Sequence, residues 1–255
     1  MKTATNNKTL CSNWAHLEKW FEEDLGRALL QAEEYQLSQA LPDLFGYHLV
    51  QVGAISQNNL LGASRISHRV VLTVEPLKTS PVAQGPVCLA AALPLATQSV
   101  DVVLLHHLLE FDPNPHQVLR EVERVLIGEG HAVIIGFNPW SLWGLWKLGL
   151  GWRGQPPWCG CFFSQRRVKD WLRLLGFDIV RARHFFFRAP IKSPKMTGIF
   201  DILNKTGAAR WPYCGGAYIV VAKKRLVTLT PIPLNSRARR LVPDEVVEPC
   251  PMVDS

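Results

Sequence analysis

Residues 93–136, LPLATQSVDVVLLHHLLEFDPNPHQVLREVERVLIGEGHAVIIG, decide how this chain is expected to fold. Asp101–Leu105 is a short apolar run with the length of a buried strand, and His131–Phe137 is a second such run. Between them, Pro115–Leu126 carries apolar residues at steps of three and four, which predicts an amphipathic helix that the following glycines end. Strand, helix and strand in this order form a βαβ unit, which is typical of a parallel sheet.

The sequence on either side of this stretch extends the same alternation. A polar and apolar pattern with helical spacing over Asn13–Ala40 predicts one helix or two, with Ser12 as N-cap. Ser164 is expected to cap a later helix, Gln165–Leu175. The remaining predicted strands are 48–52, 69–74, a weak strand near 87–89, 178–187 and 217–222. These elements predict an α/β fold with a doubly wound, mostly parallel, Rossmann-like sheet covered by helices on both faces.

We expect the chain to divide into three parts. Residues 1–42 are expected to form an N-terminal helical extension, and 43–225 the main domain. Residues 226–255 contain prolines and scattered charges without periodicity, which predicts a disordered tail. Five of the nine tryptophans fall within 138–163, so we interpret this segment as an insertion or lid on the main domain.

Three of these tryptophans, Trp140, Trp143 and Trp146, are spaced to share one short helix whose aromatic face packs on the domain. Three interpretations of the segment remain open. It is an aromatic pocket for a substrate, an interfacial anchor in which Lys147 and Arg153 meet anionic headgroups, or an apolar plug over the sheet.

Composition and charge narrow the class of protein. The 255 residues are 47% hydrophobic and 19% charged, an ordinary globular balance. No apolar run reaches the length of a membrane span and no secretory signal is seen, so the expected location is the cytoplasm. The six cysteines include no C-x-x-C pair and match no zinc framework, which predicts reduced thiols and no metal site.

The positive charge is concentrated in one segment. Residues 147–225 hold 16 Lys and Arg against 3 Asp and Glu, within a chain whose formal net charge is +7. Such a segment favours anionic partners, either phosphorylated or carboxylated small molecules or an anionic membrane surface. In the second case, we expect the chain to bind peripherally to the inner face of the membrane. Alternatively, it is a solvated basic face without a specific partner. Nucleic acid is ranked well behind, because only the basic stretch supports it.

Four phrases stand in register in the quoted stretch: Leu93-Pro94-Leu95, Ser99-Val100-Asp101, Leu109-Glu110-Phe111 and Arg124-Val125-Leu126-Ile127-Gly128-Glu129-Gly130. Together they resemble a pattern of the class I S-adenosylmethionine-dependent methyltransferases. The chain resembles the small-molecule branch of this family over about 45–137. The resemblance implies a methyltransferase with S-adenosylmethionine as cofactor, and with the basic segment it leads us to expect a small or lipid-like, anionic acceptor. Asp101 falls at a position that is chiefly structural in the family.

The resemblance also implies where the cofactor binds. Glu75, at the end of the second strand, falls where the family places the carboxylate that holds the ribose hydroxyls. Gly53 falls at the first glycine of the turn after the first strand. The residues expected to bind the cofactor are Gly53, Ala54, Glu75, Leu93 and His106.

The glycine turn departs from the family pattern. Ile55 and Gln57 stand where the family has two further glycines, and Gln51 replaces an acid. Side chains at these positions crowd the space of the methionine moiety. The alternative hypothesis is therefore a methyltransferase fold without activity, which serves as a scaffold or membrane-associated module.

Residues near the expected reaction centre follow the central strand. His107 is the candidate catalytic residue, because imidazole accepts protons near neutral pH. Glu110 and Asp112 are expected to be surface acids. Asn138 and Trp140 follow the next strand and are the candidate substrate-binding residues.

Overall fold

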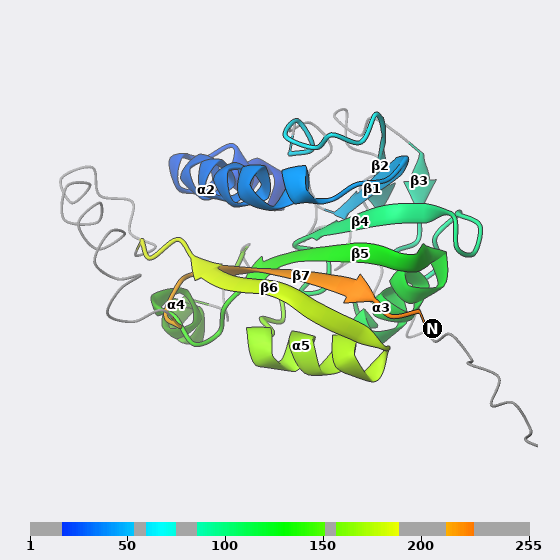
Figure 1. Cartoon of the computed structure of the whole chain (residues 1–255). Coiled ribbons are helices and arrows are strands. Elements are labelled where there is room, and N and C mark those ends of the chain that lie inside the picture. The colour runs from blue at the N-terminus through cyan, green and yellow to red at the C-terminus, as the bar shows by residue number, and fades with distance from the viewer. Residues whose placement is uncertain (1–16, 54–59, 75–85, 151–156, 189–212, 227–255) are drawn as a thin grey trace, which may run out of the picture.

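The computed structural model describes residues 17–53, 60–74, 86–150, 157–188 and 213–226. These residues form a seven-stranded sheet with strand order β3-β2-β1-β4-β5-β7-β6 (Figure 1). Strands β1 to β5 are parallel, and β7 runs antiparallel to both of its neighbours. The predicted doubly wound, mostly parallel α/β sheet is therefore confirmed.

The elements follow the order that the sequence predicts. The strands are β1 (His48–Gly53), β2 (His68–Val74), β3 (Val87–Cys88), β4 (Val100–His106), β5 (Leu126–Phe137), β6 (Phe177–Phe185) and β7 (Ala217–Lys224). The helices are α2 (Asp24–Ala40), α3 (Pro115–Val125), α4 (Leu142–Leu150) and α5 (Gln165–Leu174), and a 3₁₀ turn, Leu41–Asp43, follows α2.

The helices cover both faces of the sheet. Figure 1 shows α2 on one side of the sheet and α3 and α5 on the other. Residues 17–21 form a short helical segment before α2, so the N-terminal pattern gives two helices. Leu17, Leu29 and Leu37 are fully buried in the same core as the central strands. The N-terminal helices are thus part of the packing of the sheet.

The junction between α3 and β5 differs from the prediction. The glycines at 128 and 130 were expected to end the helix, but α3 ends at Val125 and β5 begins at Leu126. Leu126 is fully buried and pairs with Val100 of β4. This pairing favours an extended backbone already at Leu126, before the chain reaches the two glycines. Gly130 instead permits a close approach, since a Cβ atom there would lie 3.0 Å from the Asp101 carbonyl oxygen.

Asp101 has the structural role that the sequence indicates. Its Oδ2 accepts hydrogen bonds from the backbone N–H groups of Tyr47, at 2.9 Å, and His48, at 2.8 Å. These bonds fix the entry into β1 from the start of the adjacent strand β4. The carboxylate therefore sets the alignment of the two central strands at their amino ends.

The tryptophan-rich segment does form a short helix, but its tryptophans are not all packed on the domain. Helix α4 begins at Leu142, so Trp140 precedes it. Of the three tryptophans predicted to share the helix, only Trp143 is buried, and its ring stacks on Phe137 with centroids 5.7 Å apart. Trp140 and Trp146 are exposed. The expectation that all three tryptophans pack on the domain is wrong, because Trp140 precedes α4 and Trp146 is 41% exposed.

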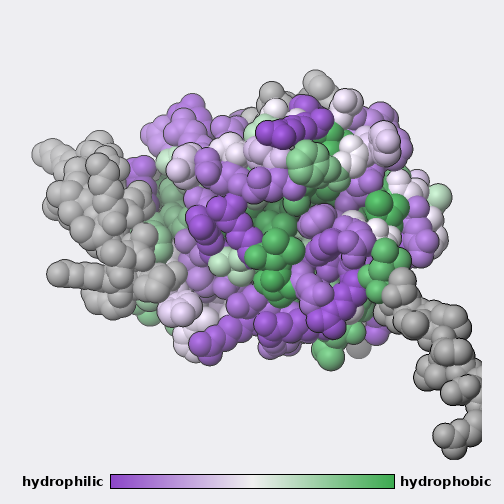
Figure 2. All heavy atoms as spheres, in the orientation of Figure 1, coloured by the Kyte–Doolittle hydropathy of each residue, from purple (hydrophilic) through white to green (hydrophobic). Residues whose placement is uncertain are grey.

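The surface in the view of Figure 1 is mostly hydrophilic. Figure 2 shows an apolar strip near its middle. Within the described residues, no helix has both the length and the apolar character needed to cross a membrane.

Candidate active site

Three parallel strands end side by side where ligands bind in sheets of this topology. Gly53 at the end of β1 is aligned with Thr73 of β2 on one side and with His106 of β4 on the other. A Cβ atom on Gly53 would lie 2.2 Å from the His106 carbonyl oxygen. Glycine is therefore required here by the close approach of β4, whatever else binds at this edge.

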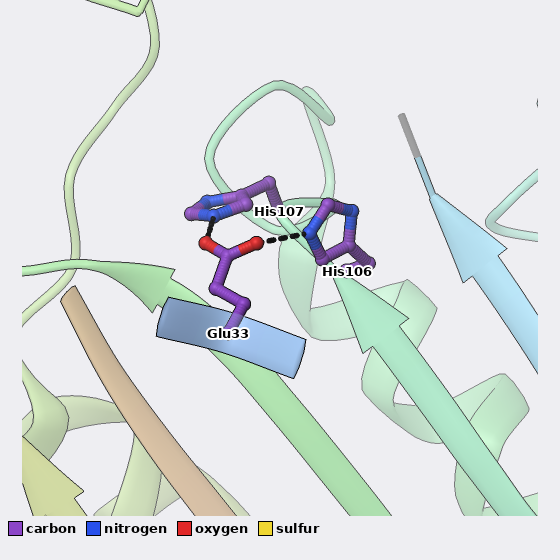
Figure 3. A group of neighbouring side chains, drawn as sticks. All are labelled: Glu33, His106 and His107. Atoms are coloured by element: carbon purple, nitrogen blue, oxygen red, sulfur yellow. Dashed lines mark hydrogen bonds and ion pairs between the residues drawn. The ribbon is translucent and has the colours of Figure 1, made fainter. Parts of the chain in front are cut away.

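Helix α2 places one carboxylate side chain, that of Glu33, in the core beside this edge of the sheet. Glu33 is fully buried, and each of its carboxylate oxygens is bonded to a different histidine (Figure 3). His106 Nε2 lies 2.8 Å from Glu33 Oε2, and His107 Nε2 lies 2.7 Å from Glu33 Oε1. Both imidazoles are fully buried too. We call Glu33, His106 and His107 the Glu33 cluster.

An unusual backbone conformation allows both histidines to reach the same carboxylate. In a regular strand, adjacent side chains point to opposite faces of the sheet. His107 has φ of +47°, a left-handed conformation that few residues other than glycine adopt. This turn at the end of β4 directs the second imidazole to the side of the first. Backbone strain of this kind clusters at functional sites.

Burial and mutual interaction shift the pKa values of all three groups. Burial alone would raise the pKa of Glu33, but the adjacent His107 and His106 lower it to about 2. Burial would lower the pKa of His107, but Glu33 and Glu110 raise it to about 9. Burial lowers the pKa of His106, and Glu33 offsets that effect only in part. At neutral pH, Glu33 is an anion, His107 a cation and His106 neutral.

The protonation states fix the hydrogen-bond roles. An ionised carboxylate only accepts hydrogen bonds, so the Nε2 atoms of both histidines carry the protons. Neutral His106 then keeps a free electron pair on Nδ1. Within the described part of the chain, that atom is buried and has no hydrogen-bond partner. This is the arrangement of a carboxylate-oriented imidazole that can accept a proton.

Glu110 lies in the core beside the cluster, so its expected place on the surface is wrong. Its Oε1 accepts a hydrogen bond from the Phe137 N–H at 2.6 Å and lies 3.5 Å from His107 Nδ1. Only 3% of Glu110 is exposed. The His107 cation is thus held between two carboxyl groups, and α2, β4 and β5 are tied together at one point.

The donor atoms of the Glu33 cluster lie within 4.8 Å of one another, a spacing at which such groups can share a cation. In the structure each Nε2–H is already bonded to a carboxylate oxygen, so the three groups satisfy one another. The prediction that this chain has no metal site stays a prediction.

The predicted substrate-binding residues meet at a cavity of about 290 Å³. Asn138 lines this cavity, although its Nδ2 already donates to the carbonyl oxygens of Tyr213 and Gly215. Trp140 lines it as well and is largely exposed. Phe137, which precedes Asn138, has its ring 4.1 Å from the ring of His107, so the cavity and the Glu33 cluster share the end of β5.

The predicted cofactor residues are brought together only in part. Gly53 and His106 are adjacent, as described above, while Ala54 and Glu75 lie outside the described residues. Leu93 is buried and tied to α3, since its N–H donates to Glu121 and its carbonyl oxygen accepts from Arg124. These hydrogen bonds hold Leu93 to α3 and not to the Glu33 cluster.

Comparison with known proteins agrees with the fold. Residues 66–134 match the model of a methyltransferase domain family. The chain belongs to the class I S-adenosylmethionine-dependent methyltransferase family. Its relative in Escherichia coli (strain K12), the uncharacterized protein YafS, is 35% identical over 216 residues, which are 85% of this chain and 84% of the relative.

Solved structures show the same fold at low sequence identity. A methyltransferase from Thermotoga maritima, described as a possible histamine N-methyltransferase, has a TM-score of 0.59 and 18% identity, covering 83% of this chain and all of its own. An S-adenosylmethionine-dependent methyltransferase from Archaeoglobus fulgidus has a TM-score of 0.53 and 20% identity, covering 81% of this chain and 97% of its own.

Proposed function

We propose that this chain transfers a methyl group from S-adenosylmethionine to a small or lipid-like, anionic acceptor in the cytoplasm. The observation that carries the proposal is the Glu33 cluster at the carboxyl end of β4, beside Gly53. Family membership supplies the class of reaction, and the cluster supplies groups suited to it. The bound cofactor contributes an electrophilic methyl group, so the protein has to position the acceptor and receive its proton.

The edge of the sheet has polar atoms to offer a ligand. Thr73 Oγ1 and His106 Nδ1 are buried without hydrogen-bond partners among the described residues, and their strands flank Gly53. Unpaired buried polar atoms are costly, so a polar ligand across Gly53 would satisfy them. Gly53, Ala54, Glu75 and Leu93 remain our proposed cofactor contacts from the family pattern.

We assign the two histidines different roles. His106 is neutral and has a free electron pair on Nδ1, so it is the better proton acceptor for the acceptor nucleophile. His107 is a cation held by Glu33 and Glu110, which makes it a positioning residue. Glu33, on helix α2, orients both imidazole rings through its two carboxylate oxygens. This division changes the initial assignment, in which His107 is the proton acceptor and His106 contacts the cofactor.

Calorimetric titration with S-adenosylmethionine and S-adenosylhomocysteine tests the proposal. We expect binding that Glu75→Ala abolishes and that Glu34→Ala, a change at an exposed position of α2, leaves intact. His106→Gln should keep cofactor affinity and lose methyl transfer to the acceptors found in a screen of anionic amphiphiles.

The alternative is a scaffold that has lost its activity, which Ile55 and Gln57 in the glycine turn favour. Absence of heat at high ligand concentration, from protein shown to be folded by circular dichroism, would overturn the enzyme proposal in favour of that scaffold.

A further inference from the structure

Helix α4 leaves most of its apolar side chains in solvent. Leu145 is 65% exposed and Leu148 is 83% exposed, whereas Trp143 on the other side of the helix packs into the core. Exposed apolar residues gathered on one element mark a binding surface more often than scattered ones do. We call the exposed apolar residues here the α4 ridge: Trp140, Leu142, Leu145, Trp146 and Leu148.

A cationic cavity adjoins the α4 ridge. It is the cavity of about 290 Å³ described above, and Trp140 belongs to both features. Arg166 and Lys169, from the first turns of α5, line the cavity, and within the described residues neither has an ion-pair partner. The amino end of a helix is itself positive, so these cations add to its field. We call this cavity the basic pocket.

A buried and unsatisfied donor independently indicates a ligand with a hydrogen-bond acceptor in the basic pocket. Gln165 lines the pocket and is only 7% exposed. Its Nε2 is buried and has no hydrogen-bond partner within the described residues. An amide N–H group in this state costs free energy unless an acceptor reaches it. A phosphate oxygen between Gln165, Arg166 and Lys169 would meet that need.

We propose that the α4 ridge and the basic pocket dock this protein on an anionic membrane surface, with a lipid phosphate in the pocket and the ridge in the headgroup layer. Tryptophan and leucine beside lysine and arginine are the composition of interfacial elements. Charge complementarity favours this occupant over a second copy of the chain, which would place the same cations against each other.

The docking surface lies close to the proposed reaction centre. Asn138 lines the basic pocket, and the preceding Phe137 packs its ring against His107. A headgroup in the pocket is therefore held near the end of β5, next to the Glu33 cluster. The idea that the bound lipid is also the methyl acceptor rests on the proposed function, whereas docking itself does not require catalysis.

Vesicle co-sedimentation of the full chain tests the docking. We expect binding to vesicles of phosphatidylcholine with phosphatidylglycerol and little binding to phosphatidylcholine alone. Leu148→Glu should abolish binding, while Leu174→Glu, at an equally exposed leucine at the end of α5, should not. Arg166→Gln and Lys169→Gln should each weaken binding about fivefold. Arg120→Gln, on the exposed side of α3, is the matched charge control.

The readout separates this inference from the proposed function, because vesicle binding needs no cofactor. Failure of cofactor titration with retained vesicle binding removes the enzyme and keeps the docking. Equal binding to both kinds of vesicle, or equal loss with Leu148→Glu and Leu174→Glu, would overturn the proposal. Absence of vesicle binding would also overturn the proposal. If light scattering then showed a dimer that Leu148→Glu dissociates, the α4 ridge would instead bind a second copy of the chain.

Discussion

The carboxylate of Glu33 accepts a hydrogen bond at 2.7 Å from the Nε2 of His107, which lies 74 residues further along the chain. This contact joins helix α2 to the end of the central strand β4. A buried ion pair of this kind is weak evidence for stability, because both groups must give up water. Its place beside Gly53, at the ligand-binding edge of the sheet, instead indicates a functional reason for keeping it.

Removing the shared carboxylate should destabilise the protein. Glu33→Ala leaves the His107 cation buried with only Glu110 nearby, and breaking a buried pair from one side costs about 3–5 kcal/mol. We expect a loss of this size in the free energy of unfolding, measured by urea denaturation. Glu34→Ala changes the adjacent, exposed acid and should have little effect. Similar losses in the two variants would contradict the buried cluster.

The pH dependence of stability should carry the signature of His107. Its pKa is raised to about 9 in the folded protein, above the ordinary value of 6.5. The stabilisation it provides is therefore complete below pH 6.5 and is lost as the pH rises through about 9. Glu33, with a pKa lowered to about 2, behaves in the opposite way and loses its contribution as the pH falls from 4.5 through about 2.

Urea denaturation across this range isolates the His107 contribution. The difference in stability between the protein and its His107→Gln variant should be constant between pH 4.5, where Glu33 starts to protonate, and pH 6.5, and should shrink towards pH 9. The exposed histidine variant His116→Gln serves as the control and should show no such change. A difference that grows with pH would show that His107 is neutral in the folded state.

Most of the sheet could be predicted because its signals are local. The apolar runs that became β1, β4 and β7 have the length and composition of buried strands, and amphipathic spacing identifies α3 and α5. The start of β5 was missed, because the burial of Leu126 against the neighbouring strand outweighs the glycines that follow. Such pairing depends on residues distant in sequence, and no local pattern reports it.

The candidate site could be predicted only in part for the same reason. His106 and His107 stand at the end of a predicted strand, so their position was visible in the sequence. Glu33 was treated as one of many acids on an amphipathic helix. It falls, however, in step with Leu25, Leu29 and Leu37 on the buried side of α2, and an acid on an apolar stripe is a signal that could have identified it.

The close approach at Gly53 should make this position intolerant of any side chain. Gly53→Ala places a Cβ atom 2.2 Å from the His106 carbonyl oxygen, so β1 and β4 have to separate. We expect a loss of stability of about 1–3 kcal/mol and a loss of cofactor affinity. Gly149→Ala, where nothing lies within 4 Å, is the control and should leave both unchanged or slightly raise stability. Tolerance of alanine at Gly53 would contradict the arrangement of the strands at this edge.

The orientation of α4 predicts opposite outcomes for two of its tryptophans. Trp143 is almost fully buried, packs on Phe137 and donates from Nε1 to the Arg188 carbonyl oxygen at 2.7 Å. Trp143→Ala should therefore cost about 3–5 kcal/mol of stability in thermal or urea unfolding. Trp146→Ala, on the exposed side, should cost less than about 1 kcal/mol and should weaken vesicle binding instead. If Trp146→Ala destabilised the fold as strongly as Trp143→Ala, the outer side of α4 would be packed against protein, and the α4 ridge would not be free to meet a membrane.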